Sequence, residues 1–152
     1  MKVYVASSWR NLYQPGVIEV LRGEGHEVYD FRNPREGDNG FAWSDIDLRW
    51  QLWSLHRYRD CLAHPLAEAG FTSDMDALKW CDTVVAVQPF GRSASLELGW
   101  AAGAGKLTVL YLDEDGGEPE LMVKMCDHIC IGLDEVVKVL DKEAANAAKG
   151  GE

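Results

Sequence analysis

Short apolar runs alternate along the chain with segments in which apolar residues recur at helical spacing. Thr83–Gln88 is a nearly continuous β-branched run, which is typical of a central strand buried on both faces of a sheet. The strands that the pattern predicts are Lys2–Ala6, Glu27–Phe31, Thr83–Gln88, Leu107–Leu112 and His128–Ile131. The helices that it predicts are Pro15–Arg22, Ser73–Asp82, Leu96–Ala104, Pro119–Met125 and Asp134–Ala148.

Strands that alternate with helices indicate right-handed βαβ units and a parallel sheet. Five strands in this order predict an α/β fold, a flavodoxin-like or Rossmann-like three-layer sandwich with a five-stranded parallel sheet. A length of 152 residues suits one domain, which we expect over residues 1–148, with 149–152 as a frayed tail.

One segment departs from the regular alternation. A loop rich in Gly, Asn and Pro covers Asn33–Gly40, and Phe41–His64 then contains neither Gly nor Pro. Aromatic and aliphatic residues recur there at roughly helical spacing, so we expect one long helix or two consecutive helices.

In open parallel sheets, ligands bind beyond the carboxyl ends of the strands, where the strand order reverses. The loops that begin at Ser7, Arg32, Pro89 and Asp113 are therefore the expected binding region.

Charge and composition narrow the classes of function. A net charge of −10 argues against a nucleic-acid polymer as partner, because binding many phosphates requires a basic face. A single nucleotide as ligand remains compatible with this net charge, because a few local donors can hold it. No apolar run approaches the roughly 20 residues of a membrane-spanning helix, and the N-terminus leads directly into a strand-like run. We expect a cytoplasmic protein without a membrane partner.

The four cysteines lack the paired spacing of a zinc site. Cys126, His128 and Cys130 lie close in sequence, but their alternation fits a strand whose side chains face opposite ways. Buried free thiols are the favoured interpretation, and a metal or redox role is the alternative. We expect no metal and no cofactor.

The segment Gly91–Lys106 is the most informative stretch because it follows the central strand and opens a helix. Ser93 or Ser95 can cap that helix, whose free backbone N–H groups can receive an anion. Glu97 then falls in the first turn, where the helix dipole favours an ionised carboxylate. Such a carboxylate can attack an anomeric carbon, or it can simply complement the dipole.

Two further segments offer polar side chains at the same end of the predicted sheet. Ser73 and Asp76 resemble a capping box, which leaves Asp74 at the start of its helix, free to face a ligand. In the first loop, Ser8 is followed by Arg10, whose guanidinium can bind a phosphate or carboxylate in a forked geometry.

The aromatic residues of the irregular segment can form a core, an oligomer interface or a stacking surface for a nucleobase. Trp43, next to the Gly37–Gly40 loop, is the best candidate for a lid. His56, Arg57 and Arg59 form a basic cluster, which could serve a phosphate site of a neighbouring subunit or be a solvated helix face.

The run Ser93–Lys106, with Glu97-Leu98-Gly99-Trp100-Ala101 at its centre, resembles the signature of the nucleoside 2-deoxyribosyltransferase family. The acids of Ser73–Asp82 and the loop Ala6–Arg10 are similar to other parts of the same family. The first loop is closest to the branch that hydrolyses deoxynucleoside 5′-monophosphates. The resemblance covers most of the chain through Leu112, except for 35–70.

The resemblance implies that Glu97 is the nucleophile of a glycosyl-enzyme intermediate and that Asp74 binds or protonates the leaving base. It makes Ser8, Arg10, Ser93 and Ser95 candidates for contacts with the sugar and the phosphate. Arg92 and Trp43 are further candidates for substrate contacts, which the residues themselves suggest and the resemblance does not. The resemblance also implies a homodimer or a larger homo-oligomer.

The sequence departs from the transferase pattern in the loop Gln88–Arg92. This loop contains no acid, and Arg92 carries the opposite charge. The departure favours an anionic 5′-monophosphate over a free nucleoside, with water as the acceptor. Base exchange on free deoxynucleosides and a non-catalytic nucleotide-binding module are the alternatives. Ser95 also stands where the family often has Gly.

Overall fold

The computed structural model describes residues 1–112 and 118–150. Its five strands are β1 (Lys2–Ala6), β2 (Glu27–Asp30), β3 (Thr83–Val87), β4 (Leu107–Tyr111) and β5 (His128–Cys130). Its α-helices are α1 (Gln14–Gly23), α2 (Leu55–Cys61), α3 (Pro65–Trp80), α4 (Arg92–Gly103) and α5 (Leu133–Gly150). Three short 3₁₀ helices cover Trp43–Asp45, Trp50–Leu52 and Leu121–Met125.

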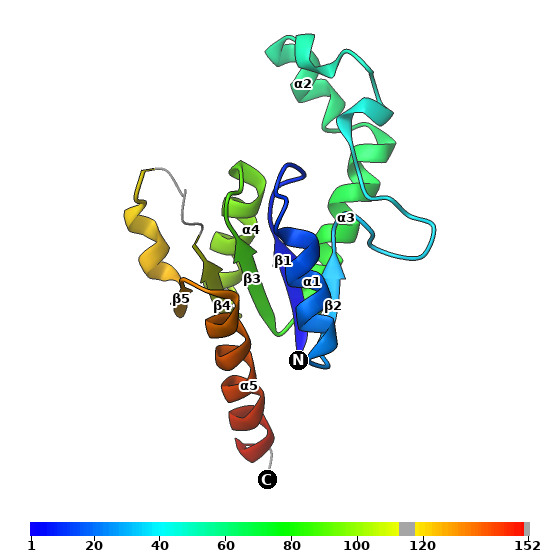
Figure 1. Ribbon diagram of the computed structural model, residues 1–152. Helices are drawn as coiled ribbons and strands as arrows, with labels where there is room; N and C mark the ends of the chain where they lie inside the picture. Colours follow the sequence, from blue (N-terminus) through cyan, green and yellow to red (C-terminus); the bar gives the residue numbers. More distant parts are fainter. Residues whose placement is uncertain (113–117, 151–152) are drawn as a thin grey trace.

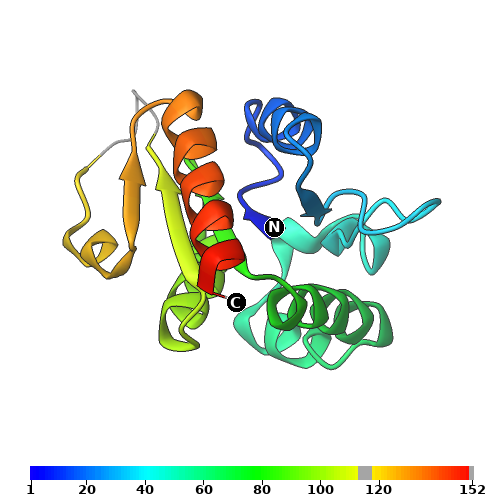
Figure 2. The same cartoon turned by 90° about the horizontal axis from the view of Figure 1, so that it is seen from below.

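The strands form one parallel sheet in the order β2-β1-β3-β4-β5 (Figure 1). Helices α1 and α5 cover one face of the sheet, and α3 and α4 cover the other (Figure 2). The three-layer α/β sandwich predicted from the sequence is therefore confirmed. The strand order reverses between β1 and β3, so the loops after these two strands border the switch point.

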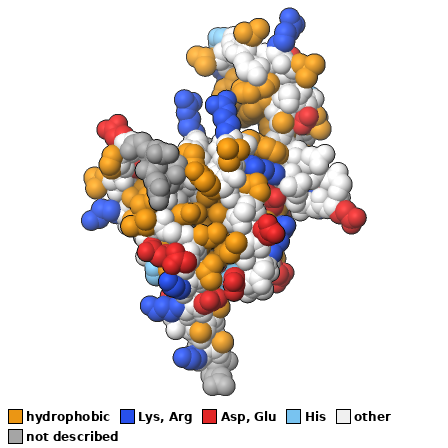
Figure 3. Space-filling view, in the orientation of Figure 1, with side chains coloured by type: hydrophobic (Ala, Val, Ile, Leu, Met, Phe, Trp, Pro, Cys, Tyr) orange, Lys and Arg blue, Asp and Glu red, His pale blue; other side chains and the backbone are white. Residues whose placement is uncertain are grey.

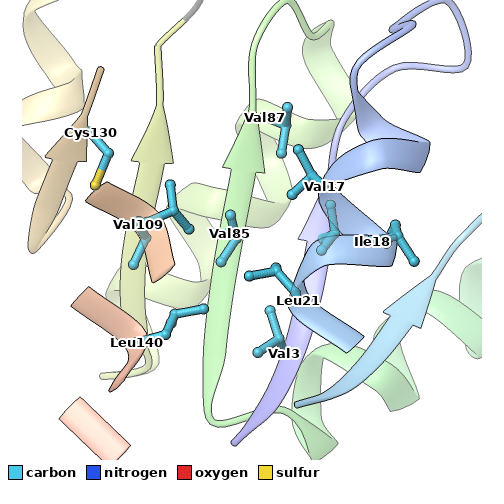
Figure 4. Close-up of a cluster of buried hydrophobic side chains, with 11 residues drawn as sticks. Val3, Val17, Ile18, Leu21, Val85, Val87, Val109, Cys130 and Leu140 are labelled. Carbon is cyan, nitrogen blue, oxygen red and sulfur yellow. The ribbon is translucent and has the colours of Figure 1, made fainter. Parts of the chain in front are cut away.

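Each face of the sheet has its own apolar core. Val3, Val85 and Val87 point towards α1 and α5, where they pack with residues such as Leu21 and Leu140 (Figure 4). Val5 belongs to the same cluster. On the opposite face, side chains of the sheet pack against α3 and α4; they are Tyr4, Ala6, Val84, Ala86 and Leu110. The two helices contribute Ala77, Leu78, Ala94, Leu98 and Ala101 to this cluster. Where these side chains are small, α3 and α4 can lie close to the sheet and bring their polar residues near the strand ends.

The prediction for Ser73–Asp82 is wrong at its start, since α3 begins eight residues earlier, at Pro65. Proline favours the first position of a helix, and the His64 ring accepts a hydrogen bond from the Leu66 N–H. Ser73 is therefore inside the helix, and the predicted capping box does not exist.

In place of the one long helix or two consecutive helices expected over Phe41–His64, the structure has two 3₁₀ turns and the short helix α2. The carboxylates of Asp45 and Asp47 accept hydrogen bonds from the backbone N–H groups of Ala42 and Arg49. Such local bonds compete with helical ones, and only short 3₁₀ turns form. The α-helix α2 begins at Leu55, after Ser54 caps it.

Smaller differences occur near the C-terminus. The helix expected over Pro119–Met125 is a 3₁₀ helix over Leu121–Met125. Helix α5 continues through Gly150, two residues beyond its expected end, and residues 151–152 of the expected tail lie outside the described residues. None of the helices in the described part of the chain has the length and apolar character of a membrane span.

Candidate active site

A cavity of about 600 Å³ lies at the carboxyl ends of β1 and β3, within the roughly 300–1,000 Å³ range of small-molecule sites. The loops after these strands form part of its wall, helices α3 and α4 contribute one carboxyl group each, and the segment after β2 closes it. Its lining residues are Ser7, Ser8, Trp9, Arg10, Phe31, Phe41, Ala42, Trp43, Ser44, Trp50, Asp74, Gly91, Arg92, Ser93, Ala94 and Glu97.

The structure thus brings together Glu97, Asp74, Ser8, Arg10, Arg92, Ser93 and Trp43, which the sequence had predicted. Ser95 is the exception. Its side chain lines a separate cavity on the other side of α4, and its hydroxyl donates to the Gly91 carbonyl at 3.1 Å. The loop expected from Asp113 onwards lies outside the described residues.

Glu97 lies in the second turn of α4, because the helix begins at Arg92 rather than near Leu96. Gly91 precedes the helix without any side-chain cap, so neither Ser93 nor Ser95 caps it. Burial raises the pKa of Glu97 to about 7, and the nearby charge of Asp74 adds to this rise. Glu97 therefore lies beyond the first turn, to which the dipole effect is largely confined, and desolvation raises its pKa.

Asp74 lies in the middle of α3, and burial raises its pKa as well. The Tyr29 hydroxyl donates a hydrogen bond of 2.8 Å to the Asp74 carboxylate, and this bond opposes part of the rise. The same hydroxyl is 3.0 Å from the Ser73 hydroxyl, which accepts a hydrogen bond from the Arg35 guanidinium. The Tyr29 hydroxyl thus holds one oxygen of the Asp74 carboxylate, and Asp74 itself lines the cavity.

A second tyrosine lies beside Glu97. The Tyr4 hydroxyl interacts with the Glu97 carboxyl group and lowers its pKa slightly, although the pair does not reach the geometry of a full hydrogen bond. Tyr4 and Tyr29 are paired in register on β1 and β2, and their rings stack at 5.2 Å. From the sequence, both tyrosines look like ordinary strand residues. Their spacing on two parallel neighbouring strands is the signal that could have identified them.

The loop after β1 is held firmly to the loop after β3. Ser7 and Asn11, both buried, donate from their side chains to the Val87 carbonyl at 2.8 and 3.0 Å. Asn11 also donates to the Pro89 carbonyl and accepts from the N–H groups that open α1. The Ser8 hydroxyl accepts from the Arg10 backbone N–H. These bonds fix the backbone that carries Ser8 and Arg10, a role of Asn11 that the sequence analysis missed.

Arg10, Arg92 and Ser93 are exposed at the rim of the cavity. Figure 3 shows basic side chains projecting at the end of the molecule where the central strands finish. The cavity therefore has two electrostatic ends, with carboxyl groups inside and guanidinium groups at its opening. An anion placed at the rim would meet positive charge in a protein whose net charge is −10.

Trp43 forms the centre of an aromatic cluster. Its ring makes edge contacts with Phe41, Trp53 and Tyr58 at centroid distances of 4.8, 5.6 and 5.8 Å. Both Trp43 and Trp50 line the cavity. The rings of this segment therefore pack on one another, although none is fully buried, and Trp43 and Trp50 also present aromatic surface to the cavity.

In the part of the chain that the structure describes, no three His, Cys, Asp or Glu side chains are grouped to hold a metal ion. Cys130 is buried and Cys126 is partly buried, and both are free thiols.

No protein-family model matches the chain, and no curated protein matches its sequence. Among solved structures, a 2-deoxyribosyltransferase from Bacillus psychrosaccharolyticus superimposes with a TM-score of 0.60 and 20% sequence identity, over 90% of each chain. A CMP N-glycosidase from Clostridium botulinum gives a TM-score of 0.48 and 21% identity, over 93% of this chain and 99% of that one. The first similarity shows that this chain shares the fold of the transferase, which agrees with the resemblance of the sequence motifs.

Proposed function

We propose that the protein cleaves the N-glycosidic bond of a (deoxy)nucleoside 5′-monophosphate or nucleoside through a covalent intermediate on Glu97. The observation that carries this proposal is the pair of largely buried carboxyl groups, Glu97 and Asp74, in one cavity with arginines at its rim. The shared fold with a 2-deoxyribosyltransferase supports it. We propose a cytoplasmic enzyme that needs no cofactor.

In the first step, a Glu97 carboxylate oxygen forms a bond to the anomeric carbon of the sugar. The bond from that carbon to the base nitrogen breaks, and its electron pair leaves with the base. Asp74 supplies a proton to the leaving base. Glu97 must be ionised and Asp74 protonated for this step, so the pair must hold one proton in total. Two carboxylates in one desolvated cavity favour such a singly protonated state near neutral pH.

In the second step, water attacks the anomeric carbon and releases the sugar from Glu97. Asp74, now ionised, accepts the proton of the attacking water. The Tyr29 hydroxyl stabilises this ionised form of Asp74 through its 2.8 Å hydrogen bond. The same two groups thereby complete both steps.

The rim favours a substrate with a 5′-phosphate. Arg10 and Arg92 supply positive charge, and Ser8 and Ser93 supply hydroxyl donors at the same opening. We infer that the phosphate binds there, that the base lies towards Asp74, and that Trp43 or Trp50 stacks on the nucleoside. Hydrolysis is favoured over transfer because the loop Gln88–Arg92 provides no acid for a free nucleoside.

A panel of nucleosides and 5′-monophosphates, analysed by chromatography for free base, tests the proposal. We expect base release from a monophosphate by the wild type and its loss in Glu97→Ala. Glu19→Gln, which alters an exposed glutamate on α1, is the matched control and should retain activity. Ligand binding without any base release would reject the enzyme and support the alternative of a non-catalytic nucleotide-binding module. Release that survives in Glu97→Ala would remove the nucleophile assignment.

The acceptor is tested in the same assay by adding a second free base. A new nucleoside or nucleotide would identify a transferase, whereas free sugar or sugar phosphate alone would identify a hydrolase.

We further propose that the protein is a homodimer or a larger homo-oligomer. The segment from Leu48 to Phe71 exposes many large apolar side chains in the isolated protomer, which is typical of an interface. They are Leu48, Leu52, Leu55, Tyr58, Leu62, Leu66 and Phe71. Sedimentation equilibrium gives the mass in solution, and a monomer at all accessible concentrations would exclude this part of the proposal.

A further inference from the structure

Arg32 follows β2 and lies behind the loop that carries Ser8 and Arg10. Its guanidinium atom Nη2 donates to the backbone carbonyls of Ser8 and Asn11, both at 2.7 Å. Arg32 is not among the residues that line the cavity. It therefore contacts the two flanks of the loop segment that presents Arg10, but not the space that a substrate would occupy.

The position of Arg32 is itself fixed on both sides. The Asp30 carboxylate, which is buried, accepts from the Arg32 backbone N–H at 3.0 Å and from the buried Gln14 side chain at 2.8 Å. The guanidinium carbon lies 5.8 Å from the centre of the Trp9 ring and 5.7 Å from that of Phe31. The two rings contact each other edge-on at 5.4 Å, and the planar cation lies beside both of them, which restricts its orientation.

Neither Ser8 nor Asn11 belongs to a strand or a helix, so their carbonyls take no part in a regular backbone ladder. The Asn11 N–H donates to the Ser8 carbonyl, so these two residues close a short turn around Trp9 and Arg10. Arg32 bonds to the carbonyl at each end of that turn. A change in Arg32 would therefore be transmitted to the backbone that aims the Arg10 side chain.

We propose that Arg32 is a positioning residue for the anion subsite, which acts on the substrate phosphate only through the turn Ser8–Asn11. This inference rests on the proposed function, since it concerns the subsite assigned there to a 5′-phosphate. It assigns Arg32 no contact with the substrate. It also means that the subsite is built from β1 and β2 together.

The test replaces Arg32 with Met, which keeps an apolar stem and removes the donors. We expect binding of inorganic phosphate, measured by calorimetry, to weaken at least about tenfold, since small misplacements of a binding group are costly. We expect a similar loss in kcat/KM for a 5′-monophosphate, carried by KM, and a change below about threefold for the matching nucleoside. Arg22→Met is the control, because Arg22 also donates to a backbone carbonyl, that of Val28, but does not line the cavity.

A double-mutant cycle with Arg10→Ala separates positioning from general damage. If Arg32 acts through Arg10, Arg32→Met should add little to the loss already caused by Arg10→Ala. Equal losses for nucleoside and nucleotide, or additive losses in the cycle, would overturn the proposal. If Arg32→Met does not fold, Arg32→Lys carries the same test, because lysine lacks the planar guanidinium that lies beside the two rings and donates to both carbonyls.

The phosphate titration also keeps this inference separate from the proposed function. Phosphate binding that depends on Arg10 and Arg32, without base release from any substrate, would retain the positioning role and reject the glycosidase. Base release without any weakening of phosphate binding in Arg32→Met would retain the glycosidase and reject the positioning role of Arg32. Wild-type protein that binds no phosphate would overturn the inference.

Discussion

Burial raises the pKa of both Glu97 and Asp74, and the charge of Asp74 raises that of Glu97 further. Burial is the larger cause for Glu97, with the charge of Asp74 second. Tyr4 and Tyr29 act in the opposite direction, each on one carboxyl group. At the scale of the residue, the chemistry of the site is therefore set by four side chains, of which the sequence identified only the two acids. Tyrosines in a buried strand look like core residues until the sheet brings them beside a carboxylate.

The pH dependence of base release follows from this arrangement. Because Glu97 must be ionised to attack, kcat/KM should rise with pH, with a midpoint near 7 on the acidic side. Asp74→Asn removes the neighbouring charge and should lower the pKa of Glu97, which an NMR titration of the Glu97 carboxyl group can measure. The same variant should lose roughly 10²–10⁴-fold in kcat if Asp74 transfers the proton. An unchanged Glu97 pKa in Asp74→Asn would contradict the coupling.

The raised pKa of Glu97 also predicts an effect on stability. An acid whose folded pKa exceeds its unfolded value penalises folding when it is ionised, so the penalty is absent below about 4.5 and complete above about 7. Glu97→Gln should therefore raise the free energy of unfolding at pH 8 by roughly 2–3 kcal/mol and leave it unchanged near pH 4. Urea denaturation at several pH values measures this. A constant difference across pH would disagree with the assignment.

At the scale of the element, the predictable parts were those governed by periodicity. All five strands and the sheet class follow from β-branched runs and alternation, and Lys2–Ala6 was predicted to the residue. The segment from Phe41 to His64 was not predictable in the same way, because two aspartates bind their own backbone and interrupt the helical spacing. The start of α3 was missed because His64 is an uncommon cap. The predicted position of Glu97 within α4 was wrong for a similar reason. Gly91 precedes the helix without a side-chain cap, so the sequence does not mark where the helix begins.

The loop between β2 and the aromatic cluster contains a position where only glycine fits. Gly40 has φ of 73°, and a Cβ there would lie 2.2 Å from the Phe31 carbonyl and 3.1 Å from the Trp9 ring. Gly40→Ala should therefore lower the free energy of unfolding by more than about 2 kcal/mol and also disturb Trp9 beside Arg32.

Gly37→Ala is the matched control, because Gly37 has φ of 78° but no neighbour within 4 Å of the added carbon. It should cost only about 1–2 kcal/mol of backbone strain. Urea midpoints at a constant slope compare the two variants. Equal destabilisation of the two variants would show that the close approach of Gly40 to Phe31 does not affect the free energy of unfolding.

At the scale of the whole molecule, the segment that carries α2 extends beyond the carboxyl ends of the strands (Figure 1). Its apolar side chains are exposed in the protomer, while its inner face closes the cavity through Trp43 and Trp50. The position of this segment relative to the sheet depends on tertiary packing, which local sequence patterns do not contain. The proposed interface and the site therefore share one structural unit.

If this segment forms the interface, Leu52→Asp with Leu55→Asp should dissociate the oligomer. The expected change is a fall in mass by sedimentation, with little effect on the thermal stability of the protomer, because both side chains are at least 80% exposed. Ile131→Asp, at an apolar position after β5 that is 69% exposed, is the control and should leave the mass unchanged. Loss of folding in the double variant would show that these leucines stabilise the protomer itself.

Among the described residues, every side chain that lines the cavity belongs to the first 97 residues, whereas β4, β5 and α5 follow later in the chain. A growing polypeptide would thus leave the ribosome with these lining residues before the strand that pairs with the second edge of β3. Until Leu107–Tyr111 emerges, that edge keeps unpaired backbone groups, and the part of the sheet that α5 covers stays in water. Of the later residues that the structure describes, none lines the cavity, but β4 and α5 complete the sheet and the core on which the cavity rests.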